Sequence, residues 1–391
     1  SLLAAGVVER LPEPDETGRT VALTMDLQRG FALNQPLSAF ALAAIELLDP
    51  ASPSYALDVV SVIESTLEDP RGVLGAQQWL ARGQAVAEMK ADGLDYDERM
   101  ELLDDVSWPK PLEELLTAAL ELYRHTHPWI SERDLSPKSV ARDLHERAMT
   151  FGEFIAFYKL TRGEGMVLRY LSDAYKALRQ TVPLSARTEE LTDIVEWLGE
   201  VVRQTDSSLL EEWEQLTSGY DGQLTPGGLD PLATARAGAE RPLSANERAL
   251  RVMVRTAMWR KVSLFALRRW NDLAALDEAA VARGREALDL SPIDVAPWDA
   301  SPLDALGWQE AVEGYFAEYA DVGTGPDARG PGLTVIHPEP GRWRVEQIID
   351  DPAGDRDWRI RAVVDLAATD AAGELILLTT GAGPVSVQSQ D

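Results

Sequence analysis

Cysteine is missing from this 391-residue chain, and lysine is scarce, with 6 residues against 31 arginines. Without cysteine there can be no disulfide, no thiolate metal site and no cysteine nucleophile, and a reducing cytoplasm is the expected location. Long apolar runs are missing too, because none approaches the roughly 20 residues that cross a bilayer. No membrane partner is therefore expected. The 45% hydrophobic content and 11 tryptophans are typical of a globular protein with a sizeable core.

Positive charge is in short supply, since the formal net charge is −28. Residues 1–220 carry 38 acidic and 20 basic residues, a net −18, whereas residues 234–285 carry 5 acidic and 11 basic residues, a net +6. Phosphate binding normally requires a basic patch or stripe. The composition excludes a nucleic-acid-binding surface that covers the whole protein, and it directs attention to local groups of cations.

Catalytic motifs are also missing. No G-x-x-x-x-G-K-[ST] loop occurs, so we expect no ATP hydrolysis by this chain alone, and no nucleophile elbow supports a hydrolase. The tetrapeptide DEAA at 277–280 is expected at the end of a helical stretch and not at the end of a strand, which disfavours a metal-holding acidic motif. His125 and His127 lie two residues apart and do not share a helix face, which favours a solvent-facing pair over a metal site. We predict no catalytic residue, no metal ligand and no cofactor in this chain, and whether it is an enzyme stays open.

The spacing of apolar residues divides the chain into regions of different type. A period near 3.6 dominates from about Leu37 to Leu216, residues 218–231 are rich in Gly and Pro, and a period of two appears after residue 333. We predict a multidomain, mostly α protein. Its regions are the end of a module (1–30), an all-α helical bundle (31–217), a linker (218–242) and an α+β domain with a curved antiparallel sheet (243–391).

Individual elements follow from the same patterns. In the bundle we expect helices over 38–49, 54–68, 75–93, 111–126, 136–160, 163–182 and 188–206. In the last domain we expect helices over 242–276 and 303–322, then extended segments at 334–337, 341–351, 357–368 and 373–380. The turn residues PAGDRD and TDAAG between the later segments predict an antiparallel meander of three strands. Near the start we expect the end of a helix over 2–11 and a strand over 19–28.

Three cations recur at intervals of seven residues: Arg162, Arg169 and Lys176. A helix advances about 100° per residue, so they form one line on the predicted helix 163–182. The apolar side chains cluster on the opposite side of that helix. They are Val167, Leu171, Ala174, Leu178 and Val182. Spacing alone leaves two meanings open: a solvated helix face, or a track for the phosphates of a single strand.

A second basic face comprises Arg248, Arg251 and Arg255, which share an i, i+3, i+7 spacing. These side chains either contact RNA or pair with the acidic bundle, and the net −18 of residues 1–220 favours pairing or solvation.

The stretch RGEGMVLRYLSDAYKALRQT (162–181), preceded by MTFGEFIAFYKLT, resembles the C-terminal helical bundle of superfamily-two DEAD/DEAH-box RNA helicases that serve exosome-type RNA decay. The family pattern is F-E-G-S-hydrophobic-hydrophobic-R, then R-R, then an L-R-Q ending. The matching residues are Glu164, Gly165, Arg169, Leu178, Arg179 and Gln180. Three positions depart from the pattern, with Met166 for the usual Ser, and Ser172 and Asp173 for the usual Arg pair.

The resemblance extends over roughly residues 30–216 and is closest to the C-terminal half of actinobacterial helicases of this type. It implies that residues 1–30 end a winged-helix module and that the bundle is an accessory region whose ratchet helix contacts single-stranded RNA. It also implies that ATP and Mg²⁺ belong to motor domains of the same polypeptide, and that RNA-decay proteins are partners. By this resemblance Arg169 is the best RNA contact. Its weaker neighbours are Arg162, Lys176 and Arg179.

The alternative is a protein-interaction module that recruits RNA-decay or ribosomal partners without touching RNA. The last domain resembles, by element order, the nuclear transport factor two-like α+β cone. Such cones serve several functions, so the fold decides nothing by itself. His337 and Asp365 are conceivable as an acid/base pair there, but a structural role is favoured for this histidine.

Overall fold

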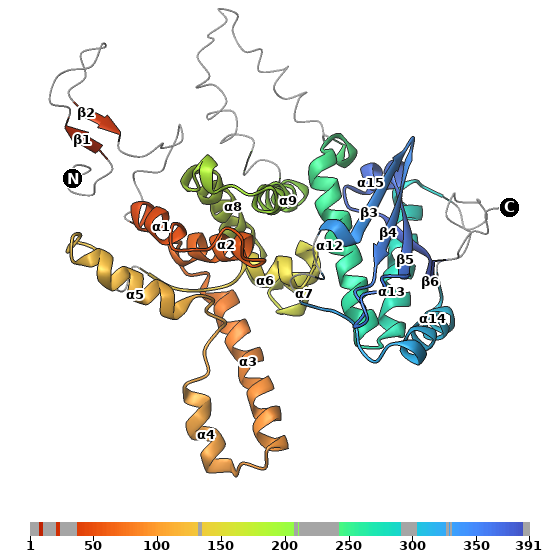
Figure 1. Ribbon diagram of the computed structural model, residues 1–391, viewed down its shortest axis with the longest axis horizontal. Coiled ribbons are helices and arrows are strands. Elements are labelled where there is room, and N and C mark those ends of the chain that lie inside the picture. The colour runs from red at the N-terminus through yellow and green to blue at the C-terminus, as the bar shows by residue number, and fades with distance from the viewer. Residues whose placement is uncertain are drawn as a thin grey trace, which may run out of the picture. The chain divides into compact units, whose positions relative to one another are not determined.

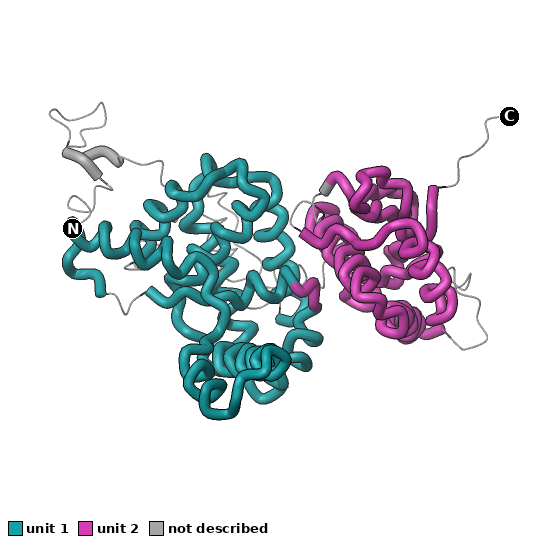
Figure 2. Tube along the Cα trace, turned by 60° about the horizontal axis from the view of Figure 1, so that its bottom comes forward, with its two compact units in different colours: residues 1–146, 150–224 teal, residues 147–149, 225–391 magenta. Residues whose placement is uncertain are grey.

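The computed structural model describes residues 8–10, 21–23, 37–131, 135–206, 210, 242–290, 303–325, 328 and 331–385. The chain forms two compact units (Figure 2): unit 1 comprises residues 1–146 and 150–224, and unit 2 comprises residues 147–149 and 225–391. The predicted fold class is confirmed, because unit 1 is built mainly of helices and unit 2 combines helices with an antiparallel sheet. The expected linker 218–242 lies outside the described residues except for Pro242.

Unit 1 is a helical bundle (Figure 1). Its helices are α1 (Ser38–Ile45), α2 (Tyr55–Ser65), α3 (Arg71–Ala91), α4 (Tyr96–Asp104), α5 (Glu113–Arg124), α6 (Ala141–Glu146), α7 (Phe151–Phe157), α8 (Glu164–Thr181) and α9 (Glu189–Thr205). Helix α8 packs against α2 and α9, whereas α3 and α4 extend side by side from the rest of the bundle. Capping boxes begin two of these helices, with Asp95 and Glu98 on α4 and Thr150 and Glu153 on α7.

Two expectations for unit 1 are wrong in detail. Residues 136–160 form two short helices instead of one, because Ala148 adopts a left-handed φ of 51° and Thr150 caps a new helix. Residues 8–10 form strand β1 (Val8–Arg10) instead of the end of a helix. This strand pairs antiparallel with β2 (Val21–Leu23), where a strand was expected. The remainder of residues 1–30, and with it the expected winged-helix end, lies outside the described residues.

The described part of unit 2 combines four α-helices with a four-stranded sheet (Figure 1). The helices are α12 (Glu247–Ala266), α13 (Trp270–Ala287), α14 (Ala305–Glu318) and α15 (Leu366–Ala372). The strands are β3 (Thr334–Glu339), β4 (Arg342–Ile348), β5 (Trp358–Asp365) and β6 (Leu377–Pro384). All four strands, one more than the expected meander of three, pair antiparallel in chain order, and a register shift between Arg361 and Ala362 interrupts the β5–β6 ladder. Such bulges bend a strand, which agrees with the expected curvature.

The period-two pattern of β4 is confirmed by its burial. Trp343, Val345 and Gln347 are buried on one side, and the residues between them are exposed or half-buried. On the neighbouring strand, the Trp358 ring meets the Tyr315 ring of α14 at a centroid distance of 5.5 Å. The helices therefore cover the apolar face of the sheet.

Two expectations for unit 2 are corrected. The segment 242–276 is not one helix, since Arg268 adopts a φ of 57° and separates α12 from α13. Residues 366–372 form α15, although they were expected to complete a strand and a turn. Asp365 begins this helix, and its carboxylate accepts the N–H of Ala368 at 2.8 Å.

Candidate nucleic-acid interface

Helix α8 is held in unit 1 by an apolar face. All five residues expected on its packing side, Val167, Leu171, Ala174, Leu178 and Val182, are at most 1% exposed. Opposite them, Arg169 is exposed and Lys176 is half-buried. The predicted amphipathic arrangement of this helix is confirmed.

A buried carboxylate fixes the orientation of α8. The Tyr170 hydroxyl donates to Glu64 Oε1 of α2 at 2.9 Å, and the same oxygen accepts the N–H groups of Val140 and Ala141 at 2.9 and 2.8 Å. A third N–H, from Arg142, reaches Glu64 Oε2 at 3.2 Å. Burial raises the pKa of Glu64, and the four donors oppose that rise. One side chain thus joins α2, α8 and the start of α6.

One of the three predicted cations lies outside the helix. Arg162 lies in a 3₁₀ turn (Thr161–Gly163) directly before α8 and not on α8 itself, and it is exposed. We call Arg162, Arg169 and Lys176 the cation stripe. Among the described residues, none of the three side chains makes a hydrogen bond or an ion pair. A stripe of this kind remains available to anions from solvent.

Asp173 lies within reach of the stripe. Partial burial raises the pKa of its carboxyl and the nearby Glu68 adds to the rise, while Lys176 and Arg169 lower it. It occupies one of the two positions where the helicase pattern has arginine. The other, Ser172, is 1% exposed, so an arginine side chain at that position would point into the packed interior.

Arg179, the remaining predicted RNA contact, has a different environment. Its guanidinium donates to the Tyr175 hydroxyl at 2.8 Å and lies 5.7 Å from the centroid of that ring. Arg187 donates to the Arg179 carbonyl oxygen at 2.7 Å. Burial, followed by the positive charge of Arg179, lowers the pKa of Arg187. Arg179 therefore contributes to packing at the end of α8.

The second basic face, Arg248, Arg251 and Arg255, lies on α12, and its three side chains have different surroundings. Arg251 pairs with Glu247 at 2.7 Å, and its guanidinium lies 5.3 Å from the centroid of the Trp343 ring. Arg248 is exposed and Arg255 is half-buried. Arg251 thus attaches α12 to the sheet of its own unit.

The acidic tetrapeptide is explained by a buried ion pair. Asp277, in the middle of α13, accepts the Lys261 ammonium at 2.7 Å and the Thr379 N–H at 2.9 Å on the same oxygen. Lys261 is 3% exposed and Asp277 is fully buried. Burial lowers the pKa of Lys261, and Asp277 opposes this. The pair joins α12, α13 and β6 inside unit 2.

The candidate histidines are placed apart from any acid/base pair. His337 is exposed on β3, opposite Arg344 of β4, whereas Asp365 on β5 lies opposite Arg342 of β4 and caps α15. One strand therefore separates them, and adjacent strands are spaced about 4.8 Å apart.

The expectation of a solvent-facing histidine pair is wrong for His127. Its ring is buried and stacks on Tyr123 at a centroid distance of 3.9 Å, while His125 is exposed. In the described part of the chain, no group of three or more His, Asp or Glu side chains could hold a metal ion.

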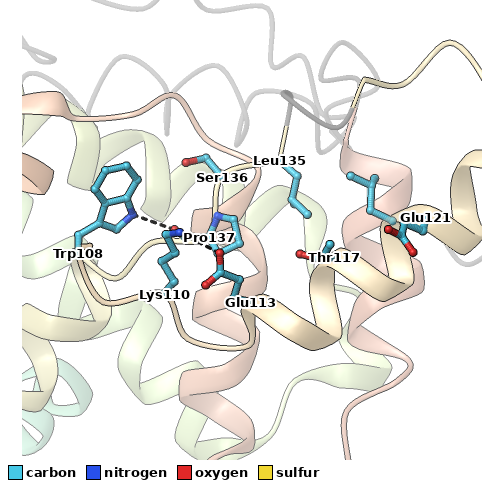
Figure 3. Close-up of a pocket in the computed structure, with 9 residues that line it drawn as sticks. Trp108, Lys110, Glu113, Thr117, Glu121, Leu135, Ser136 and Pro137 are labelled. Carbon is cyan, nitrogen blue, oxygen red and sulfur yellow. Dashed lines mark hydrogen bonds and ion pairs between the residues drawn. The ribbon is translucent and has the colours of Figure 1, made fainter. Parts of the chain in front are cut away.

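A groove of about 280 Å³ opens between the start of α5 and the segment before α6 (Figure 3). Trp108 Nε1 donates to the Pro137 carbonyl oxygen at 3.1 Å along one side. Lys110 pairs with Glu113 at 2.8 Å, and Glu121 adds a second carboxylate to the lining. With its only cation already paired, this groove is not a phosphate site.

Several exposed aromatic residues were not singled out from the sequence, and Trp79 on α3 is the most exposed of those that the structure describes. It is 71% exposed, and the Lys159 ammonium lies 5.6 Å from the centroid of its ring. A tryptophan flanked at helical spacing by Gly75, Ala76 and Gly83 is the signal that could have indicated it.

The fold and the site define a mostly α protein of two units, with Arg169 and Lys176 on the bundle helix α8 and Arg162 in the turn before it. The chain belongs to the family described as "Domain of unknown function (DUF3516)", whose sequence profile matches residues 1–382. No curated protein and no solved structure matches the chain. None of the described helices is both long and apolar enough to cross a membrane.

Proposed function

We propose that this chain is the accessory region of an ATP-dependent RNA helicase and that it contacts single-stranded RNA through the cation stripe, in the cytoplasm. One observation carries the proposal: in a chain of net charge −28, Arg169 and Lys176 on α8 and Arg162 in the turn before it have no hydrogen-bonded or ion-paired partner among the described residues. The buried face of α8 and the bond from Tyr170 to Glu64 hold Arg169 and Lys176 outward.

The stripe suits a phosphate backbone better than it suits bases. Arg169 and Lys176 lie two helical turns apart on α8, a spacing of about 10.5 Å, so each can meet a different phosphate of one strand. Phosphate contacts position a strand without reading its sequence. In this proposal the chain holds the strand, Arg169 is the central contact, and ATP and Mg²⁺ belong to motor domains of the same polypeptide.

The test is a fluorescence-anisotropy titration of single-stranded RNA at low salt with wild type and Arg169→Glu. We expect the variant to bind about 10-fold more weakly, because one phosphate contact is lost and a repulsive charge is gained. The matched control is Lys90→Glu, which makes the same change in net charge on the last turn of α3, about 27 Å along the helix from Gly72. It should stay close to wild type.

Two results would refute the proposal. One is a wild-type chain that does not bind RNA even at low salt. The other is an Arg169→Glu variant that cannot be told from Lys90→Glu. Either result would leave the alternative, recruitment of RNA-decay or ribosomal proteins without RNA contact, and the Trp108 groove is then the first surface to examine (Figure 3).

A further inference from the structure

Trp79 stands on an open stretch of helix surface. Large aromatic side chains are normally buried in part, yet this one is 71% exposed. Three of its four helical neighbours, Gly75, Ala76 and Gly83, are small and the fourth is Arg82, and a Cβ added at either glycine would meet nothing within 4 Å. Helix glycines weaken a helix, and here no close packing requires them. The ring is therefore accessible to a flat ligand from the sides where neighbouring side chains would usually stand.

A cation is held next to this ring by the turn that ends α7. Lys159 adopts a left-handed φ of 56°, and the following N–H, of Leu160, donates to the Ile155 carbonyl oxygen at 2.8 Å. Glycine is the usual residue at this position of a helix end. The lysine that stands there instead brings its ammonium to 5.6 Å from the centroid of the Trp79 ring.

Trp79 and Lys159, which we call the Trp79 platform, lie on the same side of α3 as its contact with the first turn of α8. Met166, on the first turn of α8, covers Gly72 of α3 so closely that a Cβ added there would lie 2.8 Å from its Cε. Trp79 lies two turns further along the same side of α3. Lys159 therefore contacts α3 at Trp79, and Met166 contacts the same helix two turns earlier, at Gly72. Arg162 lies between Lys159 and Met166 in the chain.

The cations next to Trp79 favour a nucleic acid over other occupants. Arg82 lies one turn beyond Trp79 on α3 and the Lys159 ammonium lies against the ring, whereas Glu88, the acidic residue of α3, lies nine positions beyond Trp79. We propose that Trp79 stacks on a base of the same single strand whose phosphates the stripe contacts, with Lys159 beside it. Every base offers a π-face, so this contact would tolerate any sequence. The inference rests on the proposed function and adds a base contact to it.

The experiment compares two oligonucleotides on the whole chain: oligouridine of about 12 nucleotides and an abasic strand of the same length and charge. Wild type should bind oligouridine about 10-fold more tightly than the abasic strand, because only the former offers bases to stack. Trp79→Ala should lose that preference while its affinity for the abasic strand stays unchanged. Trp79→Phe, which keeps an aromatic face, should recover most of it.

Trp129→Ala is the control, since Trp129 is 57% exposed in unit 1 but belongs to neither the platform nor the stripe. If Trp79→Ala keeps the wild-type preference for oligouridine while Arg169→Glu abolishes binding, the platform is refuted and the proposed function stands. If wild type binds neither strand, both are refuted. An equal loss on both strands would also overturn base stacking, since it would show that Trp79 supports the fold of the site.

Discussion

The availability of a cation in this protein depends on what already surrounds it. The Lys138 ammonium is buried, where it donates to Asp69 at 3.0 Å and to the Leu67 carbonyl oxygen at 2.7 Å. Lys261 is likewise buried, and it forms an ion pair with Asp277. Removing a charge from water is costly, so buried cations are found with partners, whereas exposed ones can remain without. Arg169 belongs to the second class, and this difference, more than its place in a seven-residue repeat, makes it a candidate contact.

The negative charge of Asp173 weakens the attraction of the cation stripe for phosphates, and its removal should strengthen RNA binding. We expect Asp173→Asn to bind single-stranded RNA about 2- to 5-fold more tightly at low salt, because Arg169 and Lys176 lose a neighbouring negative charge. The anisotropy titration measures this directly. Asp97→Asn, an exposed substitution on α4 with the same change in charge, is the control, and equal affinities for the two variants would contradict the prediction.

At the scale of elements, the position of α8 depends on its close contact with α9. A Cβ added at Gly199 would lie 2.5 Å from Cε2 of Tyr175, a fully buried ring whose hydroxyl accepts the Arg179 guanidinium. Two helices approach this closely only where one presents a bare backbone. The glycine at 199 is thus required by packing.

Gly199→Ala should lower the free energy of unfolding by about 1–3 kcal/mol, because the Tyr175 ring has to move. The matched variant is Gly165→Ala on α8, where an added Cβ meets nothing within 4 Å. It should raise stability by up to about 1 kcal/mol through helix propensity alone. Urea denaturation followed by circular dichroism measures both. Equal destabilisation by the two variants would show that the close contact is not what constrains position 199.

The elements that the sequence predicts well are those whose period is long and regular. The buried face of α8 and the alternation along β4 were both readable from spacing. The breaks at Ala148 and Arg268 were not, because both adopt a left-handed φ without being glycine. Helix α15 was missed because its start depends on Asp365 as a cap at the end of a strand.

The site was predictable only in part, for a related reason. Periodicity placed Arg169 and Lys176 on one outward line, but it could not tell that Arg251 is already paired with Glu247. Nor could it join Trp79 to Lys159, which are 80 positions apart in the chain and meet only through the fold. Contacts between distant segments depend on tertiary packing, and a single sequence carries no direct record of them.

At the scale of the whole molecule, a net charge of −28 opposes any approach of RNA. That repulsion acts over long distances and is screened by salt, with a Debye length of about 10 Å at 0.1 M. A local stripe acts through direct contact and releases counterions from the strand. The two effects respond to salt in opposite directions, so a salt titration separates them.

The salt dependence of the RNA affinity should report how many phosphates the protein contacts. For single strands the slope of log K against log salt is about −0.7 per phosphate neutralised, so the three stripe cations and Lys159 together give about −3. Screening of the general repulsion makes the measured slope shallower, and we expect a value between about −2 and −3 for wild type. Arg169→Gln, which removes one contact without adding a charge, should reduce the slope by about 0.7, and Lys90→Gln should leave it unchanged. A slope near zero in wild type, or the same slope in both variants, would mean that the stripe does not meet phosphates.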